Sequence, residues 1–197
     1  MSVTRQLSVF GVEALPAAPV DLEGLLAGPG QVVRMGGTAR VSVVVEERWR
    51  AAALVDEVRA RGLAVSCVLT ADQHIGVRTA YSSALAPLAV GWLRGAVKLP
   101  PRGFGLDGRR LRLWLIAAGH CDRLAVQLRL GSSDEPAWEA VGRALAAAGL
   151  PASLVGPRAG GPAYRIVGRR RLARLAELVG DAPPQAPDGA WPRLTAR

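Results

Sequence analysis

The chain has 197 residues, half of them apolar, and a formal net charge of +9. This apolar content is enough for a buried core and excludes a chain that is disordered throughout. No apolar run reaches the about 18 residues of a membrane-spanning helix, and no basic segment followed by a hydrophobic stretch opens the sequence. We therefore expect a cytoplasmic protein without membrane contact. The two cysteines, Cys67 and Cys121, give no disulfide framework.

The positive charge lies in the second half of the chain. Residues 1–90 hold eight arginines and eight acids, whereas residues 91–197 hold seventeen basic side chains and eight acids. Lys98 is the only lysine, and such an excess of arginine is typical of a GC-rich bacterial genome. A basic run is most often a solvated face, but a nucleic-acid surface is the sharper interpretation, because phosphates attract a cationic surface.

The first 20 residues predict an extended arm. A β-like stretch covers residues 6–10, and Pro16 and Pro19 prevent a continuous helix. Asp21 then stands where an N-cap is expected, at the start of a helix over residues 22–27.

Residues 21–94 predict a unit of helix, hairpin, helix, hairpin and helix. Gly36-Gly37 separates two strands whose apolar and polar residues alternate, as in a hairpin with one face on a core. The helix that follows should cover this core face with a stripe formed by Ala52, Val55, Val58 and Arg59. The elements expected after the first helix lie at 31–35, 39–46, 48–61, 64–70, 74–81 and 83–92.

A basic linker rich in Pro and Gly, residues 95–109, leads to a second unit of the same order at 110–180. Its first hairpin is abbreviated, because only residues 119–123 are left for the first strand and turn. A flexible Pro-rich tail, residues 181–197, follows and is either disordered or docked through Trp191. The other elements expected in the second unit lie at 111–118, 124–130, 136–148, 152–155, 163–167 and 169–179.

Fixed offsets connect the two units. Leu22-Glu-Gly-Leu-Leu-Ala-Gly-Pro-Gly30 corresponds to Leu111-Arg-Leu-Trp-Leu-Ile-Ala-Ala-Gly119, 89 residues later, and the same offset relates Trp49 to Trp138. After a two-residue shortening, Arg78 corresponds to Arg165 at an offset of 87. Similar segments in the same order at fixed offsets indicate an internal duplication.

The duplicated order and the Leu-x-Gly-Leu-Leu-x-Gly-x-Gly segment at residues 22–30 resemble the LAGLIDADG homing endonucleases in their single-chain, two-repeat form. The resemblance implies an α+β fold in which two pseudo-symmetric αββαββα repeats form a saddle over duplex DNA. It also implies a monomer whose two motif helices pack at an internal pseudo-twofold axis. The small residues expected at that contact are Gly24, Ala27 and Gly28, facing Ala117 and Ala118.

In that family the acid before the last glycine of each motif binds the divalent metals of cleavage. The corresponding residues are Pro29 and Ala118, and neither side chain can ligate a hard cation. The resemblance therefore implies no enzyme, no metal and no cofactor here. A similar loss is implied for the WhiA-type regulators, although this sequence lacks their helix-turn-helix module.

A non-catalytic, regulatory or architectural protein that binds double-stranded DNA is the first hypothesis. Polar strand residues on the saddle are candidates for base edges, and arginines of the linker are candidates for phosphates. The candidate DNA-binding residues are Arg34, Arg40, Ser42, Arg78, Arg102, Arg109, Arg110, Arg123, Gln127, Arg129 and Arg165. Taken singly, each of them also fits an ordinary solvent-facing residue.

A protein-interaction adaptor is the alternative, with the saddle or the tail binding a protein partner. The neutral first half favours it, because a wrapped duplex should meet positive charge from both halves. Residual nuclease or RNA-processing activity is disfavoured by Pro29 and Ala118. A zinc site is disfavoured too, because its candidates show no repeated ligand spacing: His74, His120, Cys67 and Cys121.

Overall fold

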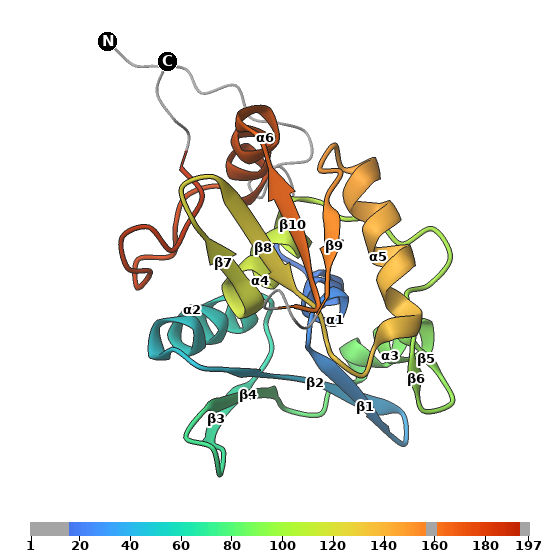
Figure 1. Ribbon diagram of the computed structural model, residues 1–197. Coiled ribbons are helices and arrows are strands. Elements are labelled where there is room, and N and C mark those ends of the chain that lie inside the picture. Colours follow the sequence, from blue (N-terminus) through green and yellow to red (C-terminus); the bar gives the residue numbers. More distant parts are fainter. Residues whose placement is uncertain (1–15, 157–160, 194–197) are drawn as a thin grey trace.

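A computed structural model of the chain describes residues 16–156 and 161–193 (Figure 1). The β-like stretch expected at 6–10 lies outside this part. In the first repeat the elements are η1 (Pro19–Leu22), α1 (Glu23–Ala27), β1 (Gln31–Met35), β2 (Thr38–Val45), α2 (Arg48–Arg59), β3 (Val65–Leu69), β4 (Ile75–Thr79), η2 (Ser83–Leu85) and α3 (Ala86–Trp92). A short hairpin of β5 (Leu93–Arg94) and β6 (Val97–Lys98) follows.

The second repeat contains α4 (Gly108–Ala118), β7 (Gly119–Cys121), β8 (Ala125–Arg129), α5 (Glu135–Ala147), β9 (Ser153–Val155), β10 (Ala163–Val167) and α6 (Arg169–Val179). Each repeat forms a four-stranded antiparallel sheet, in the order β1-β2-β4-β3 for the first and β7-β8-β10-β9 for the second. The equal strand order confirms the predicted pair of repeats, including the abbreviated β7.

The first motif segment and α4 pack together between the two sheets (Figure 1). Their close approach depends on Gly24, where a Cβ atom would lie 2.0 Å from the carbonyl oxygen of Arg110. Gly28 faces the indole of Trp114, so small residues do line the contact, but their neighbours are not the expected Ala117 and Ala118. Only glycine allows the backbones to approach this closely.

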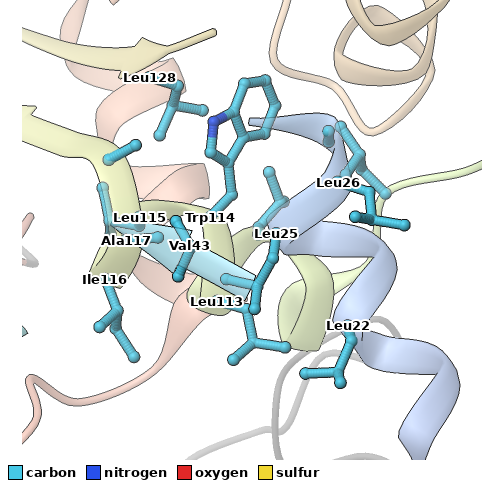
Figure 2. Close-up of a cluster of buried hydrophobic side chains, with 14 of the residues drawn as sticks. Leu22, Leu25, Leu26, Val43, Leu113, Trp114, Leu115, Ile116, Ala117 and Leu128 are labelled. Atoms are coloured by element: carbon cyan, nitrogen blue, oxygen red, sulfur yellow. The ribbon is translucent and has the colours of Figure 1, made fainter. Parts of the chain in front are cut away.

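One apolar core runs through both repeats. Figure 2 shows Leu25 of α1 beside Leu113 and Trp114 of α4, with Val43 of β2 and Leu128 of β8 close by. All five side chains are buried. Because side chains of both sheets meet around the two motif helices, the repeats fold as one unit, and the motif helices fix the position of one sheet relative to the other.

Two local expectations were wrong. Asp21 belongs to η1 and does not cap α1: its buried carboxylate accepts hydrogen bonds from Arg61 Nε at 3.1 Å and from the Ala18 amide at 3.0 Å. On α2, Ala52 and Arg59 are exposed. The apolar face of this helix consists of Ala51, Ala53, Leu54 and Val58, together with the buried Arg50.

The linker is more ordered than the sequence suggests, and of the two alternatives for the tail, docking through Trp191 agrees with the structure. Lys98, expected in a basic linker, is buried in β6. Residues 181–193 fold back on the second repeat, where Trp191 is buried and donates a hydrogen bond of 2.9 Å to the Gly180 carbonyl oxygen. Among the residues described, none of the helices is long and apolar enough to cross a membrane.

Candidate nucleic-acid interface and central cleft

The strand residues that alternate with the core residues form an outer face on each sheet. On the first sheet, Gln31 of β1 pairs with Ser42 of β2, Ser42 pairs with Arg78 of β4, and Arg78 pairs with Ser66 of β3. Residues that pair across strands point to the same side of a sheet. These four polar side chains therefore cross the sheet in one line, which we call the first polar row.

The second sheet carries an equivalent line. His120 of β7 pairs with Gln127 of β8, Gln127 with Arg165 of β10, and Arg165 with Ser153 of β9. We call this line the second polar row. None of its members is buried, and the same is true of the first row. Each outer face thus presents hydrogen-bond donors and acceptors from all four of its strands.

The rows occupy equivalent positions in the two repeats. Arg165 follows Arg78 by 87 residues and Ser153 follows Ser66 by the same interval, while His120 follows Gln31 by 89 residues. These are the offsets of the duplicated segments. Equivalent strands therefore bring equivalent residues to the surface, which relates the two rows by the pseudo-twofold symmetry of the fold.

Six of the candidate DNA-binding residues lie on the outer faces: Arg40, Ser42, Arg78, Gln127, Arg129 and Arg165. Four of these belong to the polar rows. The guanidinium of Arg40 lies over the ring of Tyr81, 5.0 Å from its centroid, so part of this side chain packs against the protein. Arg129 forms an ion pair of 3.3 Å with Glu46 of the first repeat.

The other candidates are not on the outer faces. Arg34 pairs with Ala39, whose side chain faces the core, so Arg34 points to the opposite side of the sheet from Arg40. Arg110 forms an ion pair of 2.9 Å with Glu23, which connects α4 with α1, and one of 2.6 Å with Asp107 at the N-terminus of α4 itself. Both findings correct the expected positions of these arginines, because strand alternation and contacts between the repeats decide where they lie.

Three linker and turn arginines are also separate from the rows. Arg102 is exposed in the turn before α4. Arg109 is half-buried in α4, and its Nε is buried without a hydrogen-bond partner. Arg123 lies in the turn between β7 and β8, beside a pocket that is distinct from the outer faces.

A central cleft of about 350 Å³ lies where the two repeats meet. Pro29 and Ala118, the two positions of the motif acids, both line it. Its polar lining residues are Glu46, Glu47, Arg50, His74, His120 and Arg129. The two carboxylates and the two guanidiniums balance each other, so the centre of the surface is close to neutral.

A buried lysine holds the end of the first motif. The Lys98 ammonium group donates hydrogen bonds of 2.8 Å to the Gly28 carbonyl oxygen and 2.7 Å to that of Gly30, and it forms an ion pair of 2.7 Å with Asp134. Burial lowers the pKa of Lys98, and Asp134 opposes that shift. The ammonium therefore contacts three oxygen atoms, two of which belong to the residues on either side of Pro29.

A buried arginine holds the end of the second motif in the same way. Arg50 of α2 donates hydrogen bonds to the carbonyl oxygens of Leu115 at 3.2 Å, Ile116 at 2.8 Å and Gly119 at 2.7 Å. Gly30 and Gly119 are equivalent positions in the two motifs. The carbonyl oxygens at the end of each motif segment are therefore bonded to a buried cation. A positive charge at this place also interacts favourably with the negative end of the helix dipole.

The residues present do not fit a divalent metal at this position. Pro29 and Ala118 have no ligating atom, and the neighbouring carbonyls are already engaged by Lys98 and Arg50. In the described residues no three His, Cys, Asp or Glu side chains are grouped so that they could hold a metal ion. His74 and His120 both line the cleft, but Cys121 lines another pocket and Cys67 is exposed on β3.

The ends of the rows and the two buried cations were not predicted from the sequence. Gln31 and His120, and Ser66 and Ser153, differ in number by the repeat offsets, so applying the offset to every polar strand residue would have found them. Arg50 and Lys98 gave no such signal. The carbonyl groups that they bind lie 65–70 residues away in the chain, and only the folded structure brings them together.

Comparison with known proteins identifies the fold. No protein-family model matches the sequence, and a search of the curated proteins found no match. The solved structure of the homing endonuclease I-WcaI bound to its DNA recognition sequence is similar to this chain, with a TM-score of 0.58 at 12% sequence identity, over 86% of this chain and 84% of that one. The N-terminal LAGLIDADG domain of DUF199/WhiA is similar with a TM-score of 0.53 at 10% identity, over 83% and 81% of the two chains.

Proposed function

We propose that this chain, which has the two-repeat LAGLIDADG fold, binds double-stranded DNA on the outer faces of its two sheets and does not cleave it. The observation that carries the proposal is the pair of equivalent polar rows. The structure of I-WcaI, which shares the fold, was solved with its DNA recognition sequence bound. A single chain supplies both rows, so a monomer provides the whole surface.

The chemistry of the rows suits the edges of base pairs. Arginine can donate two hydrogen bonds to a guanine, and glutamine can both donate to and accept from an adenine. Arg78 and Arg165 lie at equivalent places, and Gln127 lies directly beside Arg165. Arg78 and Arg165 are related by the pseudo-twofold axis of the protein. The two strands of a DNA duplex are also related by twofold symmetry, so each arginine can face an equivalent position on the duplex.

The absence of cleavage is supported by the ends of the motif helices. Phosphodiester cleavage by metal ions needs acids that hold the ions near the scissile phosphate. Pro29 and Ala118 supply no such ligand, and the carbonyls beside them bind Lys98 and Arg50. A protein that holds DNA without cutting it serves as a regulator or as an architectural component.

Fluorescence anisotropy of a labelled random-sequence duplex pool, titrated with the protein over a series of salt concentrations, tests the proposal. We expect affinity to fall steeply with salt, because binding releases counterions from the phosphates. The double variant Arg78→Ala/Arg165→Ala should bind more weakly, whereas Arg143→Ala/Arg170→Ala, which removes two exposed arginines outside the rows, is the matched control. No binding at low salt by the folded protein would contradict the proposal.

A cleavage assay in the same samples tests the second part. With magnesium or manganese added, the duplex should stay intact over the time in which a LAGLIDADG endonuclease cuts its own target. Cleavage that depends on the metal would overturn the non-catalytic assignment while leaving DNA binding in place. The two parts of the proposal are therefore tested separately.

A protein-interaction adaptor remains the second candidate, because one observation favours it. The outer face of the first sheet exposes Val33, Met35, Val44 and Val68 around the first polar row. Exposed apolar patches often mark protein interfaces. This candidate gains support if Val44→Ser/Val68→Ser leaves DNA affinity unchanged and abolishes binding to a purified protein partner.

A further inference from the structure

A second pocket lies away from the central cleft and the polar rows. It has a volume of about 400 Å³ and opens between the β7–β8 turn, α6 and the docked tail. In Figure 1 the second repeat runs from yellow-green at α4 to red-brown at α6, and the red tail passes beside α6 and β7. None of the residues of the two polar rows lines this pocket.

The floor of the pocket is apolar. Val126 of β8, Leu172 of α6, and Trp191 and Pro192 of the tail line it. Val126 and Trp191 are almost fully buried by the protein. Trp191 is held in place by its hydrogen bond to Gly180 and by the guanidinium of Arg112, 5.2 Å from the ring centroid. The floor is therefore a fixed apolar surface.

The rim of the pocket is cationic. Arg123 and Arg169 line it and are exposed, and neither guanidinium has a hydrogen bond or ion pair with another residue in the described part of the chain. Arg193 lies at the rim too, but it is paired with Asp188. Unpaired arginines beside an apolar pocket are suited to a carboxylate, which they bind through two parallel hydrogen bonds.

One acid and one thiol also line the pocket. The Asp122 carboxylate accepts hydrogen bonds from the amides of Leu124 and Ala125, and these bonds lower its pKa. The Asp122 carboxylate is therefore already bonded within the β7–β8 turn. Burial raises the pKa of the Cys121 thiol to about 11, so this group stays protonated near neutral pH and adds to the apolar wall.

We propose that this pocket binds a small molecule with an apolar body and a carboxylate head, such as a medium-chain fatty acid. The apolar chain lies on Leu172, Ala173 and Pro192, with Val126 and Trp191 beneath them, and the carboxylate is held by Arg123 and Arg169. A volume of about 400 Å³ is in the range of small-molecule sites. A nucleic-acid backbone fits less well, because it would place phosphates against an apolar floor.

Isothermal titration calorimetry with octanoate tests the proposal on the full chain. The unsubstituted protein should bind octanoate and not octyltrimethylammonium, which has the same apolar chain and the opposite charge. Arg123→Gln/Arg169→Gln should weaken octanoate binding at least about tenfold, because two charge-assisted contacts are lost. Arg143→Gln/Arg170→Gln removes two exposed arginines that do not line the pocket and should leave the affinity unchanged.

A second variant separates the pocket from general charge effects. Ala173 lines the pocket, so Ala173→Phe should fill part of it and weaken octanoate binding by a similar factor without reversing the charge preference. Circular dichroism should show that each variant remains folded. The proposal is overturned if octanoate does not bind, if both arginine pairs matter equally, or if phosphatidylglycerol vesicles bind in place of octanoate. None of these outcomes depends on DNA binding.

Discussion

The two repeats share a strand order and a polar row, yet the surroundings of the rows differ. The first outer face exposes four large apolar side chains around its row: Val33, Met35, Val44 and Val68. On the second, the row lies beside Arg129, and the basic excess of the chain lies in the same half. The duplication has kept the positions of the polar row, while the surface around them has changed in one repeat.

The ends of the two motif helices also differ, in the residue that supplies the positive charge. Lys98 comes from the hairpin after the first repeat, whereas Arg50 comes from α2, so the two cations that cap the motif segments are not duplicated residues. We call these two cations the caps. They nevertheless bond equivalent carbonyls, those of Gly30 and Gly119. Two unrelated solutions at equivalent places indicate that the fold needs a positive charge at the end of each motif.

The largest effect is expected from removing one of these cations. Lys98→Met removes the cation beside the buried Asp134 carboxylate, which then keeps only its hydrogen bond from Gln31, and it takes a donor from two carbonyl oxygens. It should lower the free energy of unfolding by about 3–5 kcal/mol. Arg50→Met should have a comparable effect, because the carbonyls of Ile116 and Gly119 lose their bonds to the guanidinium, and that of Leu115 keeps only its bond from the Gly119 amide. Urea unfolding of both variants measures the difference between the caps.

A double variant provides the control for that comparison. In Lys98→Met/Asp134→Asn the unpaired buried carboxylate is absent, so part of the lost stability should return. If Lys98→Met were tolerated with little loss, the requirement for a cation would hold for the second motif alone. The equivalence of the two caps would then be lost.

The contact between the motif helices depends on a glycine of the first helix, Gly24, and gives the next prediction. Gly24→Ala places a Cβ atom 2.0 Å from the Arg110 carbonyl oxygen, so the helices must separate, and we expect a loss of about 1–3 kcal/mol or more. Gly91→Ala in α3 is the control, because its nearest neighbours, atoms of Pro101, lie 3.8–3.9 Å from the new Cβ. That change should stabilise by about 0.5–1 kcal/mol. Thermal unfolding of the two variants should therefore shift in opposite directions.

Much of the fold could be predicted because its signals are local or periodic. The Gly36-Gly37 turn and the alternation of Val41, Val43 and Val45 fixed the first hairpin, and the structure confirms β1 and β2 at these places. On α2 the signal failed. Alanines occupy positions 51–53 on several sides of the helix, so the pattern did not distinguish the buried face from the exposed one.

The candidate site was predictable only where strand alternation determines orientation. Arg78 and Arg165 follow from alternation and the repeat offset, whereas Arg34 was misplaced, because its side depends on the register with Ala39. Lys98 lies in a segment whose Pro, Gly and basic residues are typical of an exposed linker. Its burial results from contacts with the distant Gly28 and Asp134, which no local pattern records.

An ion pair between the repeats gives a prediction about pH. Glu57 of α2 is bonded to Arg112 of α4 at 2.6 Å and to Arg61 at 2.8 Å. Burial alone would raise its pKa, but hydrogen bonds from these two arginines lower it below the usual value of 4.5. A lowered pKa in the folded state stabilises the protein above the unfolded-state pKa, and this stabilisation is lost as the pH falls through the folded-state value.

Glu57→Gln should therefore be less stable than the unsubstituted protein near neutral pH, by about 1–3 kcal/mol. The difference should shrink as the pH is lowered, because Glu57 becomes protonated and loses its charge. Urea unfolding at several pH values measures both effects. A difference that stays constant down to strongly acid pH would show that the charge of Glu57 does not contribute to the connection between the repeats. The second repeat has no counterpart, since α5 carries no acid after Glu139.

The smallest expected effect addresses the outer faces themselves. If the second repeat anchors the duplex, Arg165→Ala should weaken DNA binding by about tenfold and Arg78→Ala by only about threefold, because Arg78 has exposed apolar neighbours such as Val44. Anisotropy over a salt series separates two possibilities for each arginine. Loss of a phosphate contact lowers the slope of log affinity against log salt by about one, whereas loss of a base contact leaves the slope nearly unchanged. Equal losses at the two positions would mean that both rows contact the duplex to the same extent. The exposed apolar side chains of the first sheet would then not weaken DNA binding at that row.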